Sequence, residues 1–376
     1  MIKIAILAGE PSGDLIASQL MKHINSRINN VKFIGVGGPL MKKQGLNSFF
    51  DYSHLSIRGY FEVIKHIPKL LFLRHSVTKY LKEEKPSIFI GVDAPDFNLY
   101  VEKKLKGYGI PTFHYIAPSV WAWRANRINE ITKCINHLFA IFPNEPKLFN
   151  VTNSVCSYVG HPLATTIPLR PNKNVSRTKL KLKSESTVIA LLPGSRIGEL
   201  KWHMSLLLKT ALLLNNHRKD LVFLIPINNK RNLDFAIKCL SSIPVSNLKL
   251  IIGHSGDVIN SSDFVIAASG TATLESALYK KPMIITYKSS ALSYLGWKFL
   301  RLIPYIGLPN IMLKKEAVPE ILQNRATPEI LAKKTIEILS DRNYLNKLKQ
   351  DYLILHKRLK RDTSKLIFKR IRKHLK

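Results

Sequence analysis

The feature that most constrains the fold of this chain is a regular alternation of short apolar runs with longer amphipathic stretches. Eleven apolar runs predict strands, and a polar segment at 168–186 divides them into two series. Because strands that alternate with helices pair in parallel, we expect an α/β protein with two doubly wound parallel sheets, each covered by helices on both faces. The strands are expected at 2–8, 31–36, 87–92, 112–115, 137–142 and 157–159, and then at 188–192, 221–226, 248–252, 264–267 and 283–286.

The length of 376 residues predicts two domains at about 150 residues each. We expect an N-terminal domain at 1–168, a C-terminal domain at 169–345 and basic helices at 346–376, since no strand pattern follows residue 326. In open α/β sheets, ligands bind beyond the carboxyl ends of the strands. We therefore expect the domains to face each other across a cleft, with the functional residues directly after each strand.

The chain is strongly basic, with 58 Lys and Arg against 25 Asp and Glu, a net charge of +33. Residues 343–376 hold twelve Lys and Arg against only Asp351 and Asp362. Such an excess is typical of proteins that bind nucleic acid, an anionic membrane surface or an anionic substrate, although many of these lysines are expected to be simply solvated.

Neither membrane spanning nor secretion is expected. Apolar runs stay well below the roughly 18 residues of a transmembrane helix, and Lys3, Glu10 and Asp14 interrupt the start of the chain. We expect a soluble, cytoplasmic protein. Scattered histidines, the absence of a D-x-D motif and three isolated cysteines predict no metal site and no cofactor; the cysteines are Cys134, Cys156 and Cys239.

Three polar segments follow predicted strands in the first half. Residues 9–14 (GEPSGD) form a permissive turn in which Ser12 can cap the next helix, and they do not match a dinucleotide fingerprint. In residues 93–98 (DAPDFN), one carboxylate could act as a general base, and Asp96 could instead be a helix N-cap while Asp93 bonds backbone donors. Residues 114–124 (HYIAPSVWAWR) combine Trp123 with Arg124, which suit a sugar face and a phosphate, although the tryptophans could equally pack in a core.

The second half contains two predicted helix starts that favour anions. Residues 191–199 (LLPGSRIGE) place backbone N–H groups and a helix dipole beside Arg196, without the spacing of an ATPase P-loop. Residues 269–275 (SGTATLE) repeat the arrangement, with Glu275 one turn into the helix where a carboxylate can bind a ribose diol. Two such turns in one domain predict a site for a diphosphate nucleotide.

These segments, together with GHP at 160–162 and LPN at 308–310, resemble the lipid-A-disaccharide synthases over almost the whole chain. The resemblance implies a glycosyltransferase-B fold with two Rossmann-like domains, no metal, the nucleotide held mainly by the second domain, and terminal helices that pack back on the first. It also implies the reaction. UDP-2,3-diacylglucosamine would donate its sugar to the 6-hydroxyl of 2,3-diacylglucosamine 1-phosphate (lipid X), with inversion, to give a β(1→6) disaccharide 1-phosphate and UDP.

The resemblance also implies the site residues. Asp93 is the candidate base, with Asp96 left open as the alternative, and Arg196 would neutralise the leaving diphosphate. Glu10 and Ser12 would approach the reacting sugars, Glu275 would hold the ribose, and Asn310 would help the nucleotide or phosphate site. The remaining expected binding residues are Gly13, Asn98, Trp123, Arg124, Gly194, Ser195, Glu199, Ser269, Gly270 and Thr271.

Lipid substrates would give the basic charge a role. The stretches 61–85 and 290–313 mix apolar and aromatic residues with cations, and Ile64, Ile67, Leu70 and Leu71 share one helical face in the first. This pattern is typical of a helix lying on an anionic bilayer, or of a half-buried helix with extended lysines. We expect peripheral association with the cytoplasmic face of the inner membrane of a Gram-negative bacterium, and a homodimer is an open alternative to a monomer.

Two alternatives remain. A cell-wall transferase or a 2-epimerase that uses UDP-N-acetylglucosamine would share the nucleotide site, but residues 9–14 and 118–124 favour the lipid A enzymes. A nucleic-acid-binding protein would use the positive charge, but no helix-turn-helix, zinc or RNP motif is present. We therefore expect no specific nucleic-acid partner.

Overall fold

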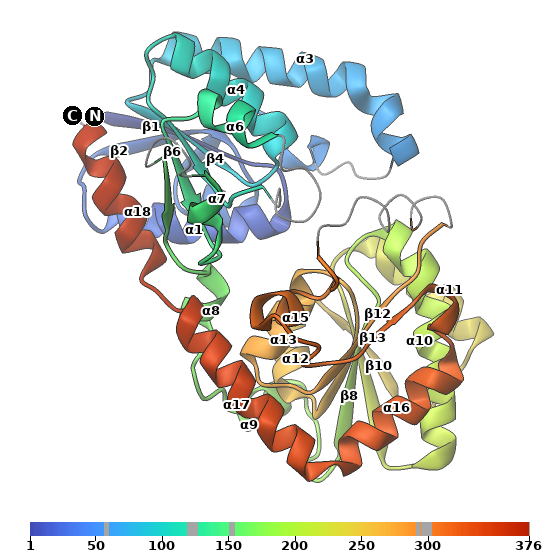
Figure 1. The fold of residues 1–376 in the computed structure, drawn as a ribbon. Helices are drawn as coiled ribbons and strands as arrows, with labels where there is room; N and C mark the ends of the chain where they lie inside the picture. The colour runs from blue at the N-terminus through green and yellow to red at the C-terminus, as the bar shows by residue number, and fades with distance from the viewer. Residues whose placement is uncertain (56–59, 119–126, 150–154, 291–293, 295–302, 376) are drawn as a thin grey trace. The chain divides into compact units, whose positions relative to one another are not determined.

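The computed structural model describes residues 1–55, 60–118, 127–149, 155–290, 294 and 303–375, without the side chains of 53 and 60–66. The chain forms two compact units (Figure 1). Unit 1 comprises Met1–Thr165 and Leu359–Lys376, and unit 2 comprises Thr166–Arg358. The last helix therefore belongs to the same unit as the N-terminus, whereas residues 346–358 belong to unit 2.

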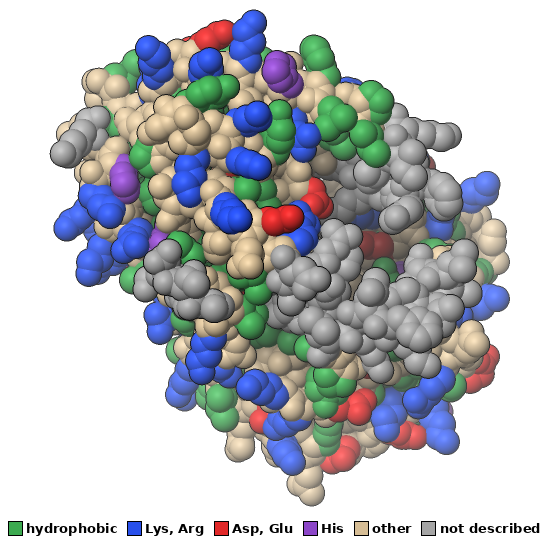
Figure 2. Space-filling model, turned by 45° about the horizontal axis from the view of Figure 1, so that its top comes forward, with side chains coloured by type: hydrophobic (Ala, Val, Ile, Leu, Met, Phe, Trp, Pro, Cys, Tyr) green, Lys and Arg blue, Asp and Glu red, His purple; other side chains and the backbone are tan. Residues whose placement is uncertain are grey.

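On the one face of the molecule that Figure 2 draws, the positive charge is dispersed. On the face drawn in Figure 2, Lys and Arg side chains are scattered over both units, with Asp and Glu between some of them. A protein that binds a nucleic-acid backbone usually gathers its cations in one stripe or patch. The face in view carries no such concentration among its described residues.

Unit 1 is built on a seven-stranded parallel sheet with the order β3-β2-β1-β4-β5-β6-β7. The order reverses between β1 and β4, which is the topological switch point of the sheet. The central strands are buried on both faces, as their continuous apolar sequences require. The strands are β1 (Ile2–Ala8), β2 (Val31–Val36), β3 (Leu46–Ser48), β4 (Ile88–Val92), β5 (Thr112–Tyr115), β6 (His137–Ala140) and β7 (Cys156–Tyr158).

Helices cover the sheet of unit 1, and α3 packs against α4. One apolar cluster joins Val77 and Leu81 of α3 to Val101 and Leu105 of α4 over Phe89 of the sheet. The helices are α1 (Pro11–Asn25), α2 (Pro39–Lys43), α3 (Tyr60–Glu84), α4 (Pro95–Gly107), α6 (Ile128–Cys134), α7 (Glu145–Phe149) and α8 (Pro162–Thr166), with a 3-10 turn at Tyr52–His54.

The C-terminal helix α18 (Thr363–Ile371), followed by a 3-10 turn at Arg372–His374, packs against α1. Ile367 and Ile371 are fully buried, and the ring of Phe368 contacts the ring of His23 edge-on at 5.7 Å between centroids. Upstream of the helix, the Leu359 carbonyl accepts a hydrogen bond from the His161 N–H at 2.9 Å. Unit 1 is thus completed by the last residues of the chain.

Unit 2 is built on a six-stranded parallel sheet with the order β10-β9-β8-β11-β12-β13. Its switch point lies between β8 and β11. The strands are β8 (Thr187–Leu192), β9 (Leu221–Ile227), β10 (Leu248–Ile252), β11 (Phe264–Ala268), β12 (Met283–Tyr287) and β13 (Glu320–Leu322). The helices are α9 (Lys173–Lys179), α10 (Ile197–His217), α11 (Lys230–Ser242), α12 (Ser255–Ser261), α13 (Thr271–Leu278), α15 (Leu308–Leu313), α16 (Pro328–Ser340) and α17 (Arg342–Leu359), with a 3-10 turn at Gln323–Arg325.

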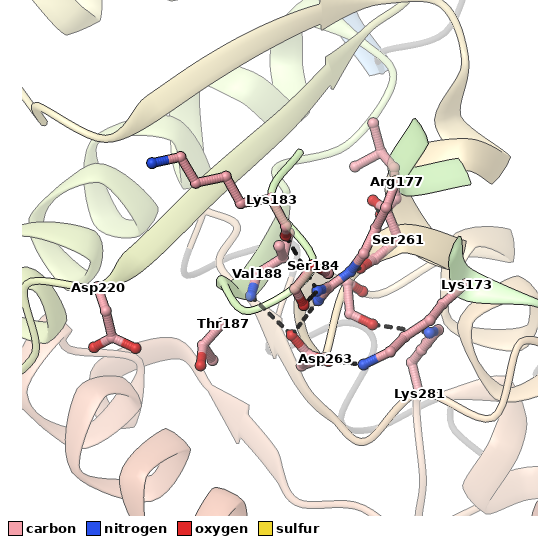
Figure 3. A network of polar contacts seen from close by, with 12 residues as sticks. Lys173, Arg177, Lys183, Ser184, Thr187, Val188, Asp220, Ser261, Asp263 and Lys281 are labelled. Carbon is pink, nitrogen blue, oxygen red and sulfur yellow. Dashed lines mark hydrogen bonds and ion pairs between the residues drawn. The ribbon is translucent and has the colours of Figure 1, made fainter. Parts of the chain in front are cut away.

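A buried arginine fixes the first helix of unit 2 (Figure 3). Arg177 of α9 is 3% exposed and donates to Asp263 Oδ2 at 2.6 Å, to the Ser184 carbonyl at 2.5 Å and to the Ser261 carbonyl at 3.1 Å. Asp263 also accepts from the Val188 N–H at the start of β8. The segment predicted as a polar linker is therefore anchored to the sheet by one charged cluster.

All eleven predicted strands are present, each within two residues of its expected bounds. The short strands β3 and β13 are the two that the sequence did not predict. Each has three residues at a sheet edge, as does β7, which was predicted.

Candidate active site

The predicted functional turns lie at the switch points of the two sheets. Strand β1 pairs with β4 through Ala8 and Val92, so the turn at residues 9–14 and the turn that begins at Asp93 are neighbours in unit 1. Strand β8 pairs with β11 through Leu192 and Ala267, which brings together the turns at 193–199 and 269–275 in unit 2. Ligands of open α/β sheets bind at this place.

The turn after β1 differs in detail from the prediction. The N-cap of α1 is Glu10, and Ser12 is an exposed residue in the first turn, so the prediction that Ser12 caps the helix is wrong. Gly13 is buried, and a Cβ at this position would lie 3.2 Å from the Cβ of Ala8. Gly13 thus lets α1 approach the sheet closely, and Glu10, Pro11 and Ser12 are the residues of this turn that reach the surface.

Asp14, the last residue of the motif, has a structural role. Its carboxylate is 3% exposed and accepts from the N–H groups of Gly38, Leu40 and Met41 at 2.9–3.0 Å. These donors belong to the first turn of α2, which an acidic side chain stabilises. A Cβ at Gly38 would lie 2.6 Å from the Asp14 carboxylate, which explains the glycine there.

The turn after β4 presents the carboxylate of Asp93. Asp93 and Ala94 both have left-handed backbone conformations, with φ of 54° and 43°. Such conformations cost about 1–3 kcal/mol each in non-glycine residues and concentrate at functional sites. Asp93 is half-buried, and no described residue makes a hydrogen bond or an ion pair with its carboxylate. Its oxygens are therefore available to a substrate.

The carboxylate of Asp96, unlike that of Asp93, has a partner. Asp96 is exposed and pairs with Nη2 of Arg127 at 2.8 Å. It is not the N-cap of α4, since that position is Ala94, so this prediction is wrong. Of the two carboxylates, Asp93 is the one whose oxygens no described residue occupies, as a general base requires.

Asn98 supports the Asp93 turn from below. It is fully buried, and its Nδ2 donates to the Asp93 carbonyl at 2.7 Å. Its side chain does not reach the surface, and its predicted contact with a ligand stays a prediction. It stabilises the strained backbone that presents Asp93.

A buried His–Glu pair lies beside Asn98, and no separate sequence signal indicated it. His114 Nδ1 of β5 lies 2.8 Å from Glu102 Oε1 of α4, and neither side chain is exposed. Burial raises the pKa of Glu102. Gly91 makes room for the pair, since a Cβ there would lie 2.3 Å from Glu102 Oε1. The pair fixes α4 to the sheet beneath the Asp93 turn.

The turn after β8 contains Gly194, Ser195 and Arg196, with Arg196 as the N-cap of the long helix α10. Glu199 folds back over this turn. Its Oε2 accepts from the N–H groups of Ser195 at 2.8 Å and Arg196 at 3.2 Å, and its Oε1 lies 2.7 Å from Arg196 Nη1. In this structure the carboxylate of Glu199 lies on two N–H donors of the turn that was predicted to bind an anion.

His203, which the sequence analysis did not single out, connects this turn to the end of β12. Burial lowers its pKa, which favours the neutral ring. Nδ1 lies 2.8 Å from the Glu199 carbonyl, and Nε2 accepts from the Lys288 N–H at 2.9 Å. Its position four residues after Glu199, on the same helix face, is the only signal that could have indicated it.

The turn after β11 is open. Gly270 is exposed, and a Cβ added there would have no described atom within 4 Å; Thr271 is the first residue of α13. The Ser269 hydroxyl donates to the Ile306 carbonyl at 2.9 Å. Glu275 is half-buried, makes no side-chain hydrogen bond or ion pair with a described residue, and has a pKa raised to about 7 by burial. This carboxylate is available to hydroxyl donors.

Asn310 has a supporting role in this structure, and its predicted help to the nucleotide or phosphate site stays a prediction. It is fully buried, and its amide donates to the Val318 carbonyl and to Glu320 while its oxygen accepts from the N–H groups of Ala317 and Val318. All four hydrogen bonds of the amide are used internally. Glu320 in turn accepts from the Ile306 and Gly307 N–H groups, which holds the carbonyl that Ser269 contacts.

Trp123 and Arg124 lie outside the described residues, as do 291–293 and 295–302 of the predicted amphipathic stretch at 290–313. Their predicted roles stay predictions. Arg127, just after the tryptophan segment, is described and lies against Asp96.

The fold and the position of these turns define a class of protein, the glycosyltransferase-B fold. The structure is similar to that of a UDP-GlcNAc 2-epimerase from Neisseria meningitidis bound to UDP-GlcNAc, with a TM-score of 0.68 and 14% identity over 99% of this chain and 100% of that one. It is also similar to a glycosyltransferase from Rickettsia africae, with a TM-score of 0.58 and 15% identity over 100% of this chain and 98% of that one.

Sequence comparison defines the family within this class. Residues 4–371 match the lipid-A-disaccharide synthetase family. The chain is 41% identical to the lipid-A-disaccharide synthase of Methylobacillus flagellatus over 96% of this chain and 97% of that protein. It is 42% identical to the enzyme of that name from Chromobacterium violaceum over 96% and 95%. The chain belongs to the lipid-A-disaccharide synthetase family.

Proposed function

We propose that this protein transfers 2,3-diacylglucosamine from UDP-2,3-diacylglucosamine to the 6-hydroxyl of lipid X, in the synthesis of lipid A. The observation that carries the proposal is the family match, which runs from residue 4 to residue 371 and so includes the switch points of both units. Two solved 2-epimerase structures share the fold of this chain at 14% and 12% sequence identity. Similarity at this level supports the fold and not a 2-epimerase activity.

The chemistry needs a base for the acceptor hydroxyl. Asp93 would take the proton of the 6-hydroxyl as its oxygen bonds to the anomeric carbon of the donor. The bond from that carbon to the diphosphate breaks, its electron pair stays on the diphosphate, and UDP leaves from the opposite face of the sugar. This geometry gives inversion. No described residue pairs with the carboxylate of Asp93, whereas the carboxylate of Asp96 pairs with Arg127. This difference supports Asp93 as the base.

The leaving group needs stabilisation of its developing charge. The proposed elements are the guanidinium of Arg196 and the N-terminus of α10, with the open start of α13 as the second anion-binding turn. The carboxylate of Glu275 would accept hydrogen bonds from the ribose hydroxyls. Glu10 and Ser12, at the surface of the turn after β1, would contact the sugars.

The decisive assay measures UDP release from UDP-2,3-diacylglucosamine and lipid X, with UDP-N-acetylglucosamine as the alternative donor. Asp93→Asn should lower kcat by about 10²–10⁴-fold, the usual contribution of a general base. Asp96→Asn is the matched control and should retain most of the activity. Turnover of UDP-N-acetylglucosamine in place of the acylated donor, or equal losses in both variants, would contradict the proposal.

Arg196→Ala tests the second unit. Losing a preorganised charge donor costs about 10²–10³-fold in kcat. Arg218→Ala is the control in the same unit, because Arg218 forms an exposed pair with Asp220 at 2.5 Å. An Arg196→Ala enzyme with normal kcat would remove Arg196 from the mechanism.

We also propose that unit 1 binds the membrane surface through α3. None of the described helices is long and apolar enough to cross a bilayer. On α3, Ile67, Leu71 and Phe72 are 41%, 47% and 69% exposed, with Lys69 among them. Leu70, which shares the predicted apolar face with Ile67 and Leu71, is half-buried. Apolar side chains beside cations suit an anionic bilayer.

Vesicle flotation tests this surface. Replacing Ile67, Leu71 and Phe72 together by Ser should abolish binding to vesicles that contain phosphatidylglycerol. A matched control replaces three equally exposed isoleucines of unit 2 by Ser, namely Ile237, Ile252 and Ile354. Equal binding of the two triple variants would exclude α3 as the contact.

A further inference from the structure

Glu199 has a position that the proposed reaction does not explain. A substrate diphosphate would need the positive end of α10 and the guanidinium of Arg196. In the structure, the Glu199 carboxylate takes the N–H groups of Ser195 and Arg196 and pairs with the same guanidinium. The carboxylate of Glu199 thus has three nitrogen donors, the kind of contacts that two oxygens of a phosphate group would make at the same place.

The turn is built to receive this carboxylate. Gly194 has φ of 114°, and a Cβ there would lie 2.4 Å from Glu199 Oε2 and 2.5 Å from Glu199 Cβ. From the other side, the Ser195 carbonyl accepts from Asn228 Nδ2 at 2.9 Å and Asn232 Nδ2 at 2.8 Å. The peptide that carries the Arg196 N–H is therefore held in place independently of Glu199.

Two anions cannot share these donors without cost. Phosphate oxygens that approach Arg196 meet the negative charge of Glu199, which is only partly exposed and therefore incompletely screened by water. Either Glu199 leaves the donors, or it stays and repels the diphosphate. Both cases weaken the binding of phosphate groups and leave the binding of the nucleoside part unchanged.

We propose that Glu199 is an internal competitor of the substrate diphosphate, and that it sets the affinity of the enzyme for UDP and for the UDP-sugar. The inference rests on the proposed function, since it requires a nucleoside diphosphate in unit 2. It revises the expectation that Glu199 binds the nucleotide: its carboxylate occupies the site that the nucleotide phosphates need. The return of Glu199 to the donors would also help the release of UDP.

The test compares uridine, UMP and UDP as ligands of the full-length protein by isothermal titration calorimetry. Glu199→Gln removes the charge and retains an oxygen that can still cap the helix. We expect it to tighten UDP binding by about tenfold or more, the value of one charge-assisted contact, with uridine binding unchanged and UMP between them. Glu329→Gln, in the exposed first turn of α16, removes the same charge from the same unit and should change none of the three.

A second variant separates competition from helix capping. Glu199→Asp keeps the charge on a shorter side chain that reaches the donors less well, so it should bind UDP more weakly than Glu199→Gln. Unchanged or weaker UDP binding in Glu199→Gln, or an equal change for uridine and UDP, would overturn the inference while the proposed function stands. If the wild-type protein binds neither UDP nor uridine, the proposed function fails, and the inference fails with it.

Discussion

Arg177 allows a quantitative prediction, because unit 2 contains two similar cation–carboxylate pairs that differ in burial. Both cations are on α9. Arg177 is 3% exposed and pairs with Asp263, which is 24% exposed, whereas Lys179 is 60% exposed and lies 3.4 Å from Asp257. Removing one partner of a buried pair costs about 3–5 kcal/mol, and an exposed pair contributes about 0–1 kcal/mol.

The structure places Arg177→Ala at the low end of that range. Asp263 keeps Lys173 at 2.9 Å and the Val188 N–H at 2.9 Å, so its charge is not left without partners. The carbonyls of Ser184 and Ser261 each lose a donor. We therefore expect a loss of about 3 kcal/mol in the free energy of unfolding of unit 2. Lys179→Ala should cost less than about 1 kcal/mol.

Urea unfolding followed by hydrogen exchange on peptides from β8 and β11 reports on unit 2 separately from unit 1. At about 2 kcal/mol per molar urea, Arg177→Ala should lower the midpoint by about 1.5 M and Lys179→Ala by less than about 0.5 M. Peptides from β1 and β4 should unfold at the wild-type midpoint in both variants. Equal shifts for the two variants would refute the argument that burial determines the strength of these pairs.

Three further outcomes follow from the site. Asn98→Ala should lower kcat by about tenfold or more with KM little changed, because Asn98 is fully buried and holds the Asp93 backbone; a rise in KM alone would contradict this. The pKa of Glu275 lies above its ordinary value, at about 7, so the carboxyl is protonated below that pH and accepts ribose hydroxyls poorly. Calorimetry should therefore show uridine affinity falling by up to about tenfold per pH unit below 7, and Glu275→Gln should remove this dependence. Gly194→Ala should lower the melting temperature, because a Cβ clashes with Glu199 and φ is left-handed, and Glu199→Ala should partly restore it; no restoration would place the strain elsewhere.

The sequence predicted the sheets well because a strand buried on both faces has a continuous apolar sequence. Strands β1, β2, β5 and β10 lie at the predicted residues. The sequence also located the candidate functional turns, because glycine and polar residues directly after a buried strand are typical of a turn that approaches a ligand. The edge strands β3 and β13 were missed, although β7, also three residues long and at an edge, was predicted.

The sequence could not determine which residues of each motif face a ligand. Asn98 and Asn310 occur within motifs as prominently as Asp93, yet both are fully buried and bond the backbone. Orientation depends on the helix that follows each turn and on its distance from the sheet, which is not encoded in spacing. The Glu102–His114 and Asn310–Glu320 pairs depend on contacts between residues 12 and 10 positions apart along the chain, and no local pattern marks them.

The contact of α18 with α1 has a consequence for how this protein is made. A ribosome releases the residues of unit 2 before it releases Leu359–Lys376, so the second half of the chain can finish folding while the first half still lacks a helix. During that interval, the surface that Ile367 and Ile371 later bury is open to water and to other nascent chains. A stop codon after residue 358 would leave unit 2 whole. It would instead remove part of unit 1, although the truncation lies at the C-terminal end of the chain.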